Sequence, residues 1–337
     1  MIVLGLATMG TSAACLVRDG EIVAAIEEER LSRIKNDGAF PMRAIAECLR
    51  MANATMGEVD AVAVYWRPWR LGARIRGTIG KAMASREARA SIARRAGKSW
   101  RGGVDAENPE AGGRWVDLFR IRRLLEAGFG PCRAEIAFYD HHLTHQVYAE
   151  ALRDWPACLS LSYDGGGEAD STVLSLVEGG RRRELRRVRW PNSLGHFYST
   201  FTGYLGFRML EGEYKMMGLA PYGAPALRDL LLERVLRLGP EGTYALDTRI
   251  CDYHRALEGS FPEALAALVG PPRAPDEAPG EGHLALAASV QAAFEAAQRH
   301  LIAWARGVAP GAGRVALSGG CALNVTANGR LLQSGLV

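Results

Sequence analysis

Three short apolar segments separated by turn residues open the chain, and they constrain its fold more than any other feature. The turns between them, Gly10-Thr11-Ser12 and Asp19-Gly20, are of the kind that joins neighbouring strands in a meander. A fourth segment, VDAVAVY, is apolar apart from Asp60, which favours a buried parallel strand. We therefore predict a mixed sheet with strands at residues 2–7, 13–18, 21–27 and 59–65.

Helix and strand patterns alternate along the rest of the chain, which predicts the α/β class. Two stretches rich in Pro, Gly and Glu, 105–115 and 271–283, are predicted to be surface loops. The predicted helices are 41–51, 141–152, 193–205, 284–308 and 326–332, and the further strands are 134–139, 158–163, 172–178, 181–189 and 315–317.

Length and composition narrow the class of protein. A chain of 337 residues suits two subdomains, and 48% hydrophobic with 23% charged residues is typical of a soluble globular protein. We find no apolar run of about 18 residues that would predict a membrane span. The six cysteines show no CxxC spacing, so we expect reduced thiols and a cytoplasmic protein.

Positive charge is concentrated in one stretch. Residues 66–102 hold nine arginines and two lysines against Glu87 alone, although the formal net charge of the chain is only +4. Because Trp66, Trp69 and Trp100 lie in it, nucleic-acid binding is one interpretation. We favour the other, an Arg-rich helical segment that covers something acidic, by about three to one. RNA is therefore a minor hypothesis, and nucleic acid is not an expected partner.

Three of the seven histidines lie within five residues, in DHHLTH at 140–145. His141 and His145 are one helical turn apart, so the two imidazoles can hold one metal ion. Asp164, at the end of the predicted strand 158–163, would add a carboxylate. A helix with histidines on a solvated face explains the spacing equally well. The three glycines after Asp164 favour the metal site, because they let a backbone approach an ion or a phosphate.

The glycine turns together resemble those of one known architecture. The Gly-Thr-Ser turn, the Asp-Gly-Gly-Gly turn and the strand-Gly-Gly-helix element at 315–332 are similar to the two phosphate loops and the adenosine loop of the actin-like ATPase fold. That fold is a duplicated, ribonuclease-H-like α/β domain with a nucleotide cleft between its halves. The resemblance implies a first subdomain at 1–190, with an Arg-rich insertion at about 66–115, and an incomplete second subdomain at 191–337.

Longer motifs resemble a single family, the O-carbamoyltransferases of nodulation-factor, cephamycin and tobramycin biosynthesis. The most specific motif is EGEYKMMGLAPYG, and the matching stretches lie at 17–41, 140–145, 164–168, 193–223 and 317–332. In this family a C-terminal domain makes carbamoyl adenylate from carbamoyl phosphate and ATP. The N-terminal domain, which is similar to the metalloenzyme that transfers threonylcarbamoyl to transfer RNA, passes the carbamoyl group to a hydroxyl of a small-molecule acceptor.

The resemblance implies a role for individual residues. His141, His145 and Asp164 match ligands of an iron-type divalent metal, although zinc and manganese suit the same donors. Lys35 matches a lysine that faces the adenylate. Lys215 and Glu213 would line the same cleft, or pair with each other, while His142 would only pack or support the site. The residues implied to contact the nucleotide are Ser12, Gly165, Gly166, Gly167, Gly319, Gly320 and Asn324.

Two departures from the family pattern matter. Gly10 stands where the family has a histidine that deprotonates the acceptor, so His196 or the metal takes over, or transfer is impaired. The family also continues beyond the last matching motif into a further metal-binding aspartate and the adenylate-forming domain. We therefore expect activity to need a C-terminal segment or separate subunit, and apolar surface to be exposed near the C-terminus.

These observations leave two main hypotheses open. The first is the N-terminal domain of an O-carbamoyltransferase, and the second is a non-catalytic subunit that binds nucleotide and metal in a split carbamoyltransferase. The sequence does not identify the acceptor, whose specificity we expect to lie in loops at 66–115 and 224–283. We expect the Arg-rich stretch to shape the acceptor pocket or a subunit contact, such as that of a homodimer.

Overall fold

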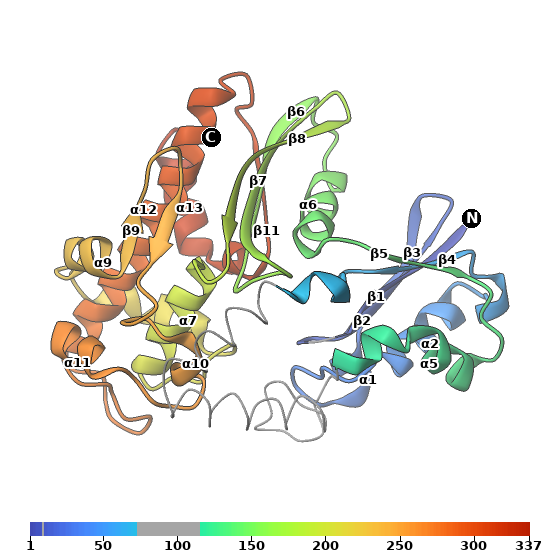
Figure 1. The fold of residues 1–337 in the computed structure, drawn as a ribbon, viewed down its shortest axis with the longest axis horizontal. Helices are drawn as coiled ribbons and strands as arrows, with labels where there is room; N and C mark the ends of the chain where they lie inside the picture. The colour runs from blue at the N-terminus through green and yellow to red at the C-terminus, as the bar shows by residue number, and fades with distance from the viewer. Residues whose placement is uncertain (9, 73–114) are drawn as a thin grey trace. The chain divides into compact units, whose positions relative to one another are not determined.

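The computed structural model describes residues 1–8, 10–72 and 115–337, which form two compact units, Met1–His141 and His142–Val337 (Figure 1). From the sequence we predicted the boundary between the two subdomains to lie between residues 190 and 191. The structure instead assigns residues 142–190 to the second unit, because the strand at Ala157–Tyr163 pairs with Val315–Ser318 near the far end of the chain. Most of the Arg-rich stretch, residues 73–114, lies outside the described residues.

The first unit is built on a five-stranded mixed sheet. Its strands are β1 (Ile2–Ala7), β2 (Ala13–Arg18), β3 (Glu21–Glu27), β4 (Ala61–Val64) and β5 (Glu135–Phe138). The order is β3-β2-β1-β4-β5, in which β1, β2 and β3 are antiparallel neighbours and β1, β4 and β5 are parallel. The predicted meander and the predicted parallel strand are confirmed.

Helices α1 (Glu28–Ser32), α2 (Met42–Met51) and α5 (Ile121–Phe129) complete this unit, with 3-10 turns η1 (Met56–Glu58), η2 (Pro68–Leu71) and η3 (Trp115–Phe119). Leu4 and Leu16 of the sheet and Ile45 of α2 are fully buried in one core. Glu28 holds α2 at its start, since its carboxylate accepts hydrogen bonds from the backbone N–H groups of Arg43 and Ala44. Trp66 is buried in the same core, so it cannot stack on a base.

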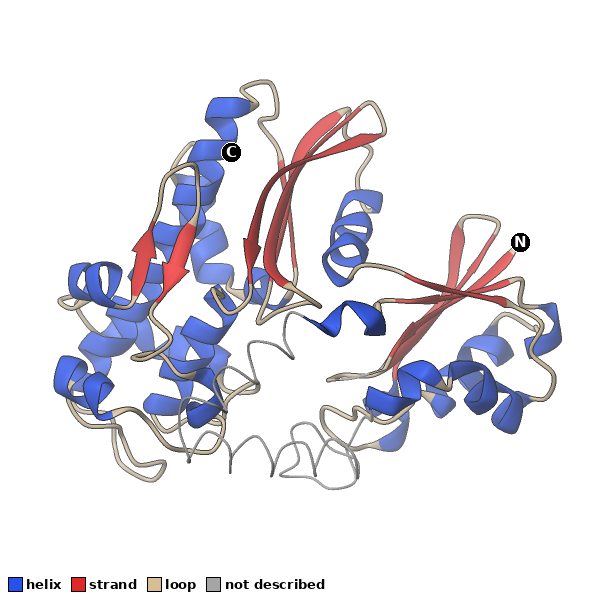
Figure 2. Ribbon diagram, viewed as in Figure 1, coloured by secondary structure: helices blue, strands red, loops and turns tan. Residues whose placement is uncertain are grey.

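The second unit contains a four-stranded sheet in the order β11-β6-β7-β8. Its strands are β6 (Ala157–Tyr163), β7 (Asp170–Glu178), β8 (Arg181–Arg189) and β11 (Val315–Ser318). The first three are antiparallel neighbours and β11 is parallel to β6. Within this unit, α6 (His141–Ala151) covers one face of the sheet and α7 (Leu194–Tyr204), α12 (Glu281–Val308) and α13 (Val325–Gln333) cover the other (Figure 2).

Between α7 and α12 the chain is more regular than expected. The segment 224–283, predicted to be loop, contains α9 (Arg228–Arg234), α10 (Tyr253–Ala256), α11 (Glu263–Val269) and the hairpin of β9 (Leu236–Leu238) and β10 (Tyr244–Leu246). The loop at its end is confirmed as far as Gly280. The remaining elements are α8 (Glu213–Leu219), η4 (Ala220–Tyr222) and η5 (Gly320–Leu323).

The two sheets share one topology. The order β3-β2-β1-β4 in the first unit matches β8-β7-β6-β11 in the second, with the same three antiparallel strands and the same parallel fourth strand. This repetition of a ribonuclease-H-like sheet confirms the predicted duplicated, actin-like α/β class.

Other predictions concern surfaces and thiols. Leu323, Val325 and Leu332, at η5 and α13, are 65–78% exposed. None of the six cysteines, all of which lie among the described residues, forms a disulfide. Among the described residues, none of the helices combines the length and the apolar character needed to cross a membrane.

Candidate metal centre

Two imidazoles and one carboxylate converge where α6 begins and β6 ends. His141 is the first residue of α6, His145 follows one turn later, and Asp164 comes directly after β6. One ligand atom from each of the three lies within 4.8 Å of the others. His145 Nε2 and Asp164 Oδ2 are 3.3 Å apart. The structure thus brings together the three residues that the sequence analysis selected as metal ligands.

The chemistry of this triad suits a transition-metal ion, and so does the spacing of one pair of its donors. Two donors each about 2.1 Å from an ion at a tetrahedral angle lie about 3.4 Å apart, close to the His145–Asp164 separation. Imidazole and carboxylate donors fit iron, zinc and manganese alike. The residues therefore fit the metal that the resemblance implied, and the metal itself stays a prediction.

The backbone around Asp164 holds its carboxylate in place. Asp164 Oδ1 accepts from the N–H of Gly165 at 2.6 Å, and the Asp164 N–H donates to the Ser171 carbonyl at 2.9 Å. Ser193, which caps α7, donates its hydroxyl to the Asp164 carbonyl at 2.9 Å. A Cβ on Gly195 would lie 2.5 Å from the Gly165 nitrogen, so the first turn of α7 packs directly on this turn. These contacts hold the Asp164 backbone, and the Gly165 N–H holds one oxygen of its carboxylate.

The predicted nucleotide glycines of the second unit surround the same turn. Gly166 has φ +154°, and the Gly167 N–H donates to the Asp170 carbonyl. Gly319 has φ +85°, and a Cβ there would lie 2.4 Å from the Tyr163 carbonyl oxygen. A Cβ on Gly320 would lie 3.0 Å from Asp164 Oδ1. Close packing against the Tyr163 backbone therefore explains Gly319 without a phosphate, and the nucleotide role of all these glycines stays a prediction.

Asn324 and Ser12 differ in how their polar atoms are used. Asn324 caps α13 by accepting from the Ala327 N–H, and its amide exchanges two hydrogen bonds with Gln291. Ser12 lies in the first unit, where its N–H donates to the Asp37 carbonyl. The Ser12 hydroxyl is buried and has no hydrogen-bond partner among the described residues. Of the two, Ser12 keeps a hydroxyl for a ligand or a water molecule.

Of the three candidate catalytic residues, Lys35 lies in the first unit, and Glu213 and Lys215 lie in the second. Lys35 donates to Glu29 at 2.9 Å, while its side chain stays 72% exposed. This hydrogen bond is the main reason why the pKa of Glu29 lies below its usual range. No sequence motif singled out Glu29. In the second unit, Glu213 accepts from the Ser199 hydroxyl and the Leu210 N–H at the start of α8. Lys215 is exposed on α8.

The residues considered as replacements for the missing base are also visible. Gly10 has φ +71° and open space around it, so it supplies a turn rather than a side chain. His196 is buried on α7, stacked on Tyr253 with ring centroids 3.6 Å apart. Its Nε2 would lie 3.6 Å from a Cβ on Gly165, which places the ring beside the Asp164 turn.

Burial and the charge of Asp164 raise the pKa of the neighbouring Cys321 thiol, so that thiol stays neutral.

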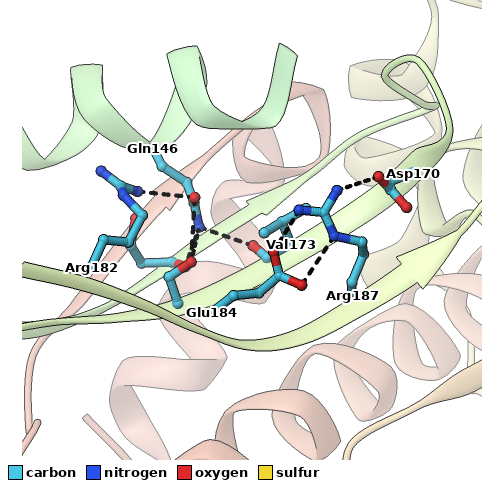
Figure 3. A network of polar contacts seen from close by, with 8 residues as sticks. Gln146, Asp170, Val173, Arg182, Glu184 and Arg187 are labelled. Atoms are coloured by element: carbon cyan, nitrogen blue, oxygen red, sulfur yellow. Dashed lines mark hydrogen bonds and ion pairs between the residues drawn. The ribbon is translucent and has the colours of Figure 1, made fainter. Parts of the chain in front are cut away.

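His142 packs on the sheet as expected. Its Nε2 donates to the Asp170 carbonyl at 3.0 Å, and a neutral ring then accepts from the Ser162 hydroxyl at Nδ1, 2.8 Å away. One turn later, Gln146 is 1% exposed and also bonds to the sheet (Figure 3). The sequence analysis missed Gln146, because a polar residue on a helix is normally assigned to solvent.

Comparison with known proteins provides an independent view of the chain. A family model described as carbamoyltransferase N-terminus matches residues 2–337. The chain is 34% identical over 335 residues to an uncharacterized protein of Synechocystis, covering 96% of this chain and 51% of that protein. It is 32% identical over 336 residues to nodulation protein NolNO of Sinorhizobium fredii, covering 97% and 43%. The chain therefore spans about half the length of these curated relatives.

Among solved structures, component A of (R)-2-hydroxyglutaryl-CoA dehydratase from Acidaminococcus fermentans is 13% identical with a TM-score of 0.41, covering 99% of this chain and 88% of that one.

Proposed function

Because the chain belongs to the carbamoyltransferase N-terminal family, we propose that it transfers a carbamoyl group from carbamoyl adenylate to a hydroxyl of a small-molecule natural product. We further propose that the adenylate is made from carbamoyl phosphate and ATP by a C-terminal domain or separate subunit. The observation that carries the proposal is the convergence of His141, His145 and Asp164. Lewis-acid catalysis of acyl transfer needs a bound metal ion, and such a donor set can hold one.

The roles of the residues follow from their chemistry. His141, His145 and Asp164 would hold the divalent ion, for which we favour iron over zinc and manganese. When bound, this ion would polarise the carbamoyl carbonyl, on whose oxygen negative charge develops during transfer. Hydrogen bonds from Gly165 and Ser193 hold the Asp164 turn in place. Lys35, supported by Glu29, would balance the phosphate charge of the adenylate.

The test is to supply the purified, metal-loaded chain with carbamoyl adenylate and a panel of hydroxylated acceptors. We expect mass spectrometry to detect a carbamate, and we expect His141→Ala to lose both bound metal and product. His300→Ala is the matched control, because His300 bonds to the Gly239 carbonyl and belongs to no candidate site. A chain that binds metal and adenylate but yields no carbamate would be the non-catalytic subunit. Full metal affinity in His141→Ala would show the ligand assignment to be wrong.

A further inference from the structure

The face of α6 that meets the sheet is polar, although it is largely buried. His142, Gln146 and Glu150 follow one another at four-residue intervals, so they form one stripe along the helix. The proposed metal ligands His141 and His145 each precede a member of this stripe by one position. Successive residues are offset by about 100° around a helix, so a rotation of α6 that moves the stripe also moves His141 and His145.

Gln146 contacts several residues of the sheet (Figure 3). Its Nε2 donates to the Ser160 carbonyl of β6 at 2.8 Å and to the Val173 carbonyl of β7 at 3.2 Å. Nε2 and Oε1 both lie within hydrogen-bond distance of the Ser175 hydroxyl, at 3.2 and 3.4 Å. Its Oε1 also accepts from Arg182 of β8 at 2.9 Å. One amide therefore ties the helix to three adjacent strands.

The two neighbours in the stripe extend this connection in both directions. His142 contacts Ser162 of β6 and the carbonyl of Asp170 in β7. Glu150 accepts two hydrogen bonds from Arg182, at 2.8 and 2.6 Å. The hydrogen bonds thus run along the length of α6. Helix and sheet can meet in this way at only one rotation and one axial position.

Stability alone does not explain a buried amide at this position. An apolar side chain of similar size would pack against a sheet without the cost of desolvating a polar group. Hydrogen bonds, unlike apolar contacts, are directional, and buried polar groups can fix a unique register for that reason. Gln146 therefore makes the placement of α6 on the sheet more precise.

The metal centre needs that precision. A ligand atom roughly 5–6 Å from a helix axis moves by about 1 Å when the helix rotates by about 10°. Metal–ligand distances tolerate only about 0.2 Å. His145 lies opposite Asp164, which is fixed to the sheet, so a small rotation of α6 changes the distance between the two donors.

We propose that Gln146 is a positioning residue of the metal centre, which sets the rotation of α6 so that His141 and His145 meet Asp164. The proposal rests on the metal site of the proposed function. It assigns no contact with the metal to Gln146 itself.

The test is a Co²⁺ titration of the purified chain, followed by visible absorption of the bound ion. We expect Gln146→Met to raise the Kd for Co²⁺ by about 10–100-fold and to alter the absorption bands, as loss of an outer contact typically does. Gln291→Met is the matched control, because Gln291 is a buried helical glutamine that bonds to Asn324 and Tyr198 away from α6. We expect the control to bind Co²⁺ with wild-type affinity.

Ser175→Ala gives a milder second variant, since it removes one of the partners of Gln146 and leaves the amide. We expect it to weaken Co²⁺ binding several-fold. Wild-type Kd and spectrum in both variants would overturn the positioning role, as would an equal loss in the Gln291→Met control. A wild-type chain that binds no divalent ion would instead refute the proposed metal site.

Discussion

At the scale of single residues, local features place the candidate metal ligands, whereas contacts across the fold place the residues that support them. His141, His145 and Asp164 could be selected because helical spacing and the end of a strand place them, and both features are local. Gln146 and Glu28 could not, because their partners are strands or helices that sequence does not place in space. Such contacts also decide the role of Asn324, because its side chain caps α13 and bonds to Gln291.

Glu29 gives a prediction at this scale, because its buried carboxylate accepts from Lys35 and from the Asn36 N–H. The Lys35 hydrogen bond, more than any other contact, lowers the pKa of Glu29 below its usual 4.5, so the charged form is the stabilising one. Its contribution is present above about pH 4.5 and is lost as the pH falls through the lowered pKa. We expect Glu29→Gln to lower the free energy of unfolding at pH 7 by on the order of 1 kcal/mol, since Lys35 is exposed.

Urea unfolding at several pH values measures this effect. The difference between wild type and Glu29→Gln should shrink as the pH is lowered below about 4.5. Glu47→Gln is the control, because Glu47 pairs with Arg50 at the surface and its loss should cost less. A Glu29→Gln difference that stays constant with pH would contradict the assignment.

At the scale of elements, periodicity predicted the long helices and the strands of the two larger sheets, and failed where contacts across the fold decide. The strands β1, β2 and β3 were predicted to the residue, since turns and alternation bound them. Helices α9, α10 and α11 were missed, because a helix of 4–7 residues has too few turns to show a periodic pattern. Packing in the core of the second unit, to which Leu231 and Leu265 belong, stabilises them instead.

The contact between α7 and the Asp164 turn gives a prediction at this scale. A Cβ on Gly195 would lie 2.5 Å from Gly165 N and 2.8 Å from Asp164 C, and neither backbone atom can move aside cheaply. We expect Gly195→Ala to lower the free energy of unfolding by about 1–3 kcal/mol through overpacking. It should also weaken binding of Co²⁺, because the displaced turn carries Asp164.

Gly329→Ala in α13 controls for the substitution itself, since a Cβ there meets nothing within 4 Å. Alanine is the better helix former by about 1 kcal/mol, so this variant should be as stable as wild type or more so. Thermal unfolding and Co²⁺ titration of both variants provide the measurements. Equal stability and equal affinity in the two would show that α7 does not constrain the turn.

At the scale of the whole molecule, one sheet topology occurs twice, each time with its own core. Leu125 belongs to the core of the first unit and Leu301 to that of the second, and no described residue belongs to both. The predicted boundary at residue 190 was misplaced because β6, β7 and β8 follow the first unit directly in sequence. They belong to the second unit because β6 pairs with β11, more than a hundred residues further on, and because all three strands contribute to the core of that unit.

Separate cores predict separate unfolding. Leu125 and Leu301 are both fully buried, so Leu→Ala at either position should remove about 2–5 kcal/mol from the stability of its own unit. We expect calorimetry of the wild type to show more than one transition, as is usual when a chain contains several cooperative units. Leu125→Ala should lower the melting temperature of one transition and Leu301→Ala that of the other. A single transition that both variants lower equally would mean that the two cores unfold as one cooperative unit.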